Sequence, residues 1–110
     1  MADPRLRQLT IKGNIVKRIA KDRMKYEEEL AGLITSQKEL EVSGADAHAI
    51  KKAVELVDET RMMISDCNQR LTKAVADLEL VIQESEGELN ESQEFQNAKT
   101  IHQEVSAGDN

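Results

Sequence analysis

Apolar residues recur at spacings of three and four along most of the chain, which is the period of one helix face. The first stripe comprises Leu9, Val16, Ile19, Tyr26, Leu30, Leu33 and Leu40. A second, nearly unbroken stripe comprises Ile50, Ala53, Val57, Thr60, Ile64, Cys67, Leu71, Ala74, Leu78 and Val81. Stripes of this kind are typical of helices that pack along a shared seam. We therefore expect two long amphipathic helices.

Capping residues indicate where these helices begin and end. Asp3 can cap a helix whose first residue is Pro4, so the first helix should span about residues 4–42. Gly44 can end it and Asp46 can cap the next, which should span about residues 47–85. If the chain folds back here, opposed seam residues should have numbers that sum to about 90, with large side chains facing smaller ones.

A third, shorter helix is expected at about residues 91–106, after the breaker Gly87 and a cap at Asn90 or Ser92. It should cover the half of the hairpin that holds the remaining unpartnered apolar residues, Ile11, Ile15, Val75 and Ile82. Residues 107–110 should form a frayed tail. The predicted fold is all-α, an elongated antiparallel three-helix bundle with two long helices in a coiled-coil hairpin, forming one domain over residues 1–110.

Composition and charge narrow the function classes. The 110-residue chain has a net charge of −6, yet residues 1–25 hold eight basic and two acidic residues. Overall acidity, without aromatic residues near the basic end, argues against nucleic-acid binding. No apolar run suggests a secretory signal or a membrane span. The lone Cys67 agrees with a reducing compartment, and we expect it to be a small buried residue in a cytosolic protein.

No pattern of residues indicates catalysis, a metal site or a cofactor. His48 and His102 lie neither beside Cys67 nor at helical metal-site spacing. Acidic runs such as Glu27-Glu28-Glu29 point in different directions around a helix, as expected for a solvated surface. There is no glycine-rich phosphate loop. We therefore expect a protein that is not an enzyme.

Two surface features are candidates for partner binding. The lysine row, which we define as Lys17, Lys21 and Lys25 with the adjacent Arg18, follows the outer face of the first helix. The methionine segment, Arg61-Met62-Met63, places Met62 away from the seam, and adjacent methionines suit an adaptable protein contact. On spacing alone the row also fits a solubilising surface, and a single exposed methionine is ordinary.

The chain resembles the tubulin folding cofactor A, or tubulin-specific chaperone A, family over nearly its whole length. The resemblance is carried by Ala2-Asp3-Pro4-Arg5, Arg7-Gln8, Val16-Lys17-Arg18, Tyr26-Glu27, Glu29, Ile50-Lys51-Lys52, Arg61-Met62-Met63-Ile64 and Asp66-Cys67. Family sequences often have a proline where this chain has Ser65, which puts any bend of the second helix in doubt.

The resemblance implies a non-catalytic chaperone that binds and stabilises near-native β-tubulin monomers before they assemble into the α/β heterodimer. It implies β-tubulin as the partner, with other tubulin-folding cofactors as further candidates, and a location in the cytoplasm at the microtubule cytoskeleton. Binding of nucleic acid or membrane is not expected. The alternative function is a generic cytosolic coiled-coil adaptor or tether in a larger helical assembly, which needs the same periodicity and no tubulin contact.

Overall fold

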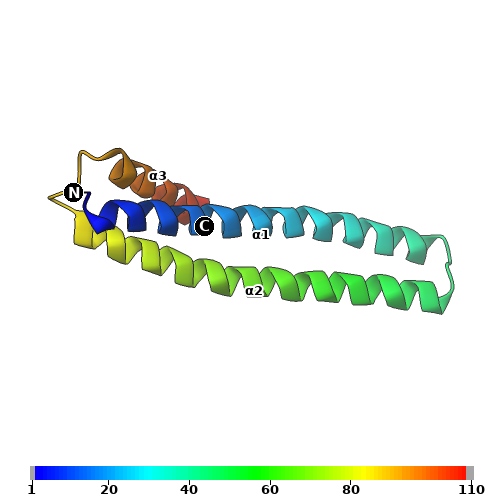
Figure 1. Ribbon diagram of the computed structural model, residues 1–110. Coiled ribbons are helices and arrows are strands. Elements are labelled where there is room, and N and C mark those ends of the chain that lie inside the picture. Colours follow the sequence, from blue (N-terminus) through cyan, green and yellow to red (C-terminus); the bar gives the residue numbers. More distant parts are fainter. Residues whose placement is uncertain (1, 109–110) are drawn as a thin grey trace. The chain divides into compact units, whose positions relative to one another are not determined.

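The computed structural model describes residues 2–108 and contains three helices, α1 (Pro4–Val42), α2 (Ala47–Ser85) and α3 (Gln93–Gly108) (Figure 1). The predicted all-α class with three helices is confirmed. Sequence reasoning placed the third helix at about residues 91–106, whereas α3 begins at Gln93 and includes Ala107 and Gly108. The last two residues of the expected frayed tail, 109–110, lie outside the described residues.

The helix ends are fixed by the caps that the sequence suggested. Asp3 accepts a hydrogen bond from the backbone N–H of Arg5 at 2.9 Å, and Asp46 accepts one from Ala49 at 2.9 Å. Gly44 has a φ of 74° and follows α1. The N–H of Ala45 reaches the carbonyl of Leu40 at 3.0 Å, which completes the hydrogen-bond pattern of a glycine-ended helix.

Of the two candidate caps for α3, the structure selects Ser92. Its Oγ accepts a hydrogen bond from the backbone N–H of Phe95 at 3.1 Å. The side chain of Asn90 instead accepts a hydrogen bond from the N–H of Gly87 at 2.8 Å, and Gly87 has a φ of 94°. This contact holds the turn between α2 and α3, so α3 starts later than expected.

Contacts divide the chain into two compact units. The first combines the start of α1 up to Ala20, the end of α2 from Gln69 onward, and α3. The second unit, Lys21–Asn68, contains the rest of α1, the connection and the start of α2. That the whole chain forms one domain therefore stays a prediction.

The first unit has a closed apolar core. Its buried residues are Leu9, Val16, Leu71, Ala74, Leu78, Val81, Ile82, Phe95 and Ala98. Ile82 is buried, and Ile15 and Val75 are partly buried and pack against the core. Ile11 remains 37% exposed, so the expectation that α3 covers it is wrong. Ile11 lies two residues from Gly13, where α3 approaches α1, and two residues correspond to more than half a helical turn. The side chain of Ile11 therefore points away from α3.

Gly13 allows this close approach. A Cβ atom built on Gly13 would lie 3.0 Å from Cδ1 of Ile101 on α3. Ordinary contacts between carbon atoms are about 3.5–4.0 Å long, so no side chain fits here without displacement of its neighbour. A glycine in the interior of a helix, which costs about 1 kcal/mol relative to alanine, thus has a packing role.

Arg5 joins the start of α1 to the end of α2 and the turn that follows. Its Nη1 donates a hydrogen bond to the carbonyl oxygen of Glu84 at 2.7 Å. Its Nη2 lies 2.6 Å from Oδ2 of Asp3 and 2.9 Å from Oε2 of Glu88. The hydrogen bonds from Arg5 lower the pKa of Asp3 to about 2, and those to Asp3 and Glu88 raise the pKa of Arg5.

The second unit is a two-helix hairpin in which burial is less complete. On α2, Val57, Thr60 and Cys67 are buried, as the seam predicted. The seam residues of α1 in this unit, Tyr26, Leu30, Leu33 and Leu40, are only partly buried because no third helix belongs to the unit. Helix α2 continues through Ser65 without interruption.

Candidate partner-binding surfaces

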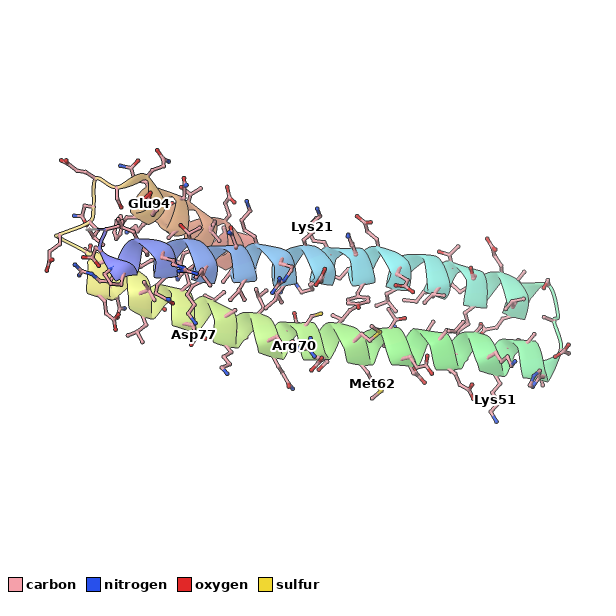
Figure 2. The ribbon with its side chains drawn as sticks, viewed as in Figure 1. Lys21, Lys51, Met62, Arg70, Asp77 and Glu94 are labelled. Atoms are coloured by element: carbon pink, nitrogen blue, oxygen red, sulfur yellow. The ribbon has the colours of Figure 1, made fainter. Side chains whose placement is uncertain are left out.

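The residues of the lysine row are exposed but do not share one environment. Lys17 lies in the first unit, where it lines a hollow with Glu94 and Glu104 of α3. Lys21 and Lys25 lie in the second unit, and Figure 2 shows Lys21 pointing from α1 away from α2. The part of the row that projects from the second unit is thus Lys21 and Lys25.

The methionine segment lies on α2 in the second unit. Arg61 is exposed, Met62 is 71% exposed and Met63 is 44% exposed. Successive residues of a helix point about 100° apart, so these three side chains leave α2 in different directions. Met62 points away from α1 in Figure 2, whereas Met63 is closer to the seam and is partly covered.

Within the second unit, the lysines of the row and the methionine segment lie on different helices. Within the second unit, Lys21 projects from the outer side of α1 and Met62 from the outer side of α2 (Figure 2). Lys51 projects from the same outer side of α2 as Met62. Lys21 and Met62 therefore leave the second unit on different sides, so each surface needs its own test.

Sequence reasoning missed Leu56 as part of a candidate surface. Leu56 is 49% exposed and lies seven residues before Met63, which is two helical turns along the same face of α2. The pair forms an apolar stripe beside the buried seam residues Val57 and Thr60. The seven-residue spacing between Leu56 and Met63 is a sequence signal for this pair. The signal is easily hidden because Leu56 stands next to the seam residue Val57.

Among residues 2–108, no group of three His, Cys, Asp or Glu side chains could hold a metal ion. Nε2 of His102 on α3 lies 4.0 Å from Oε2 of Glu79 on α2. His48 is exposed near the start of α2. No helix within these residues is both long and apolar enough to cross a membrane.

The comparisons with known proteins all lead to the same family. The family model described as tubulin binding cofactor A matches residues 4–101. Tubulin-specific chaperone A of Gallus gallus is 43% identical over 105 residues, which cover 96% of this chain and 96% of that protein.

Two solved structures share the fold. The crystal structure of tubulin folding cofactor A from Arabidopsis thaliana aligns with a TM-score of 0.87 at 34% identity, covering 94% of this chain and 96% of that one. The structure of human tubulin chaperone cofactor A aligns with a TM-score of 0.82 at 34% identity, covering 94% and 99%. The family model and the relative each span far more than half of the chain. The chain therefore belongs to the tubulin binding cofactor A family, a family of non-catalytic chaperones.

Proposed function

We propose that this protein is a tubulin-folding cofactor that binds near-native β-tubulin monomers and holds them before they join α-tubulin. The observation that carries the proposal is the family match over residues 4–101. The proposed location is the cytoplasm, at the microtubule cytoskeleton, with other tubulin-folding cofactors as further partners. Binding alone suffices for this role, because a complex lowers the concentration of free monomer available for aggregation.

The exposed surfaces are compatible with a protein partner of this kind. Lys21 and Lys25 can attract an acidic partner over a distance of about 10 Å at moderate ionic strength. Leu56, Met62 and Met63 offer half-exposed or exposed apolar area that a partner could cover. We propose that the lysine row, with Lys17 and Arg18, speeds association and that the methionine segment, with Arg61, slows dissociation.

Matched charge reversals can separate the two outer sides of the second unit. The variant K21E/K25E changes α1, and K51E/K52E makes the same change in net charge on α2. All four lysines are exposed, so helicity should not change. Binding to purified β-tubulin would be measured by surface plasmon resonance at several salt concentrations. If α1 faces the partner, K21E/K25E should slow association about tenfold and K51E/K52E should have little effect.

A second comparison tests the apolar contact. Met62→Gln should increase the dissociation rate and leave the salt dependence of association unchanged, because the substitution adds no charge and apolar contacts contribute little to long-range attraction. Leu80→Gln serves as the control, since Leu80 is a 55% exposed apolar residue of α2 in the first unit. Equal loss of binding in both variants would argue against a specific role for Met62. A folded wild-type protein that failed to bind β-tubulin would contradict the proposed function itself.

A further inference from the structure

The first unit contains a hollow between α1 and α2 that α3 does not line. Its volume is about 230 Å³, and its residues are Lys12, Ile15, Ile19, Arg70, Lys73, Ala74 and Asp77. The residues of α3 instead line two other hollows, one shared with α1 and one shared with α2. We call the hollow between α1 and α2 the basic groove.

The seam of α2 explains why this space exists. Ala74 is a buried core position between Leu71 and Leu78, both of which have almost no exposed surface. An alanine in such a position fills less volume than its leucine neighbours and leaves a depression. Ile15 and Ile19 of α1 line the depression and are only partly buried. The floor of the groove is therefore apolar and partly open to solvent.

The rim of the groove carries charge of the opposite sign to the whole chain. Lys12, Arg70 and Lys73 are basic, and Asp77 is the single acidic residue among those that line the groove. The complete chain has a net charge of −6. Lys12 and Lys73 by themselves outnumber Asp77, so the groove forms a local positive region around an apolar floor, and a ligand that matches both features must combine negative charge with an apolar group.

The size and composition of the groove favour a peptide segment over a drug-sized anion or a nucleic acid. Pockets for drug-sized molecules are commonly about 300–1,000 Å³, so the groove is small for such a ligand but suits one apolar side chain. No aromatic residue lines it, so it lacks the surface on which nucleic-acid bases stack. Basic residues around an apolar depression are the complement of an acidic segment that presents a single leucine-like side chain.

We propose that the basic groove is a docking site for an acidic peptide segment of the client protein, whose apolar side chain enters the depression over Ala74. The identity of the client rests on the proposed function, whereas the binding of an acidic, leucine-containing segment does not. The residues that line this groove belong to neither the lysine row nor the methionine segment, so the groove is an additional surface.

The test uses the complete chain and short synthetic peptides. The probe is a peptide of alternating glutamate and leucine residues, and its controls replace leucine by serine or glutamate by lysine. Binding would be followed by NMR through the methyl signals of Ile15 and Ile19. The probe should shift both signals, and the two control peptides should not. A single-stranded oligonucleotide forms a further arm, and stronger binding of it than of the probe would overturn the proposal.

Substitutions at the rim of the basic groove should either weaken or strengthen peptide binding, depending on the charge they remove. K12E/K73E should weaken peptide binding about fivefold or more, and K38E/K51E, with the same charge change in the second unit, should have little effect. Asp77→Asn should strengthen binding about twofold, which a misfolded variant would not do. Unchanged affinity in both K12E/K73E and D77N would overturn the proposal.

Binding to β-tubulin separates this proposal from the proposed function. If K12E/K73E binds β-tubulin less tightly than K38E/K51E does, the groove is the docking site of the client segment. If β-tubulin binds all variants equally, the client does not use the groove, while the proposed function stands. If the wild-type protein binds the probe peptide but not β-tubulin, the docking site is supported and the identification of β-tubulin as the client is wrong.

Discussion

The close approach of α3 to α1 leads to a prediction about Gly13. Replacing Gly13 by valine places two methyl groups beyond a Cβ that already lies 3.0 Å from Cδ1 of Ile101. Overpacking of this kind costs about 1–3 kcal/mol. Gly32 is a matched control, because it lies in the same helix and a Cβ there would have no such neighbour within 4 Å.

The pair isolates the tertiary contact. Both Gly13→Val and Gly32→Val replace a helical glycine by the same β-branched residue, so their intrinsic helix propensities change equally. The difference in unfolding free energy should therefore be about 1–3 kcal/mol. In a chain of this size, 1 kcal/mol corresponds to a change of about 4 °C in Tm. Gly13→Val should consequently melt about 4–12 °C below Gly32→Val.

The milder substitution by alanine provides an internal check. At Gly32, alanine should stabilise the protein by about 0.8–1.0 kcal/mol through helix propensity. At Gly13, much of the same gain should be offset because the side chain of Ile101 must move. Melting would be followed by circular dichroism, and hydrogen exchange would be measured on α3. Equal melting of the two valine variants, with equal exchange in α3, would show that α3 does not pack on Gly13.

The remaining predictions concern other contacts. Phe95→Ala should cost about 3–5 kcal/mol, because Phe95 is buried in the core of the first unit, and urea unfolding would measure this loss. The pKa of Asp3 falls from 3.8 to about 2 in the folded protein, so its stabilising effect is present above this window and is lost as pH falls through it. Asp3→Asn should therefore lose less stability than the wild type between about pH 4 and pH 2, as measured by unfolding at each pH. Buried Cys67 should react with a thiol reagent only as the second unit opens. Unfolding would be followed both by Cys67 labelling and by the fluorescence of a probe on α3. Coincident transitions would support one domain, and separate transitions would contradict it.

The candidate surfaces could be predicted only in part. The exposure of Met62 followed from its position outside the seam, and the exposure of Lys21 followed from the four-residue spacing of the lysines. The hollow that Lys17 shares with α3 depends on how α3 packs on α1, and the basic groove depends on which residues of α2 face Ile15 and Ile19. Neither arrangement can be found from spacing within one helix.

The sequence by itself determined the two long helices and their ends. The seam repeats every three or four residues, and each cap acts within a few residues, so both signals are local. Asp3, Gly44 and Asp46 make the capping contacts that their positions predicted, whereas the choice of Ser92 over Asn90 came from the structure.

The tertiary structure alone decided how α3 packs and what it leaves open. Helix α3 contacts Gly13, and Arg5 bonds to Glu84 and Glu88, so these contacts join residues far apart in sequence. The exposure of Ile11 follows from the same packing. Such contacts depend on the rotation of one helix about its axis relative to another. A seam of similar aliphatic residues constrains that rotation only loosely, because several neighbouring apolar positions could face the same partner.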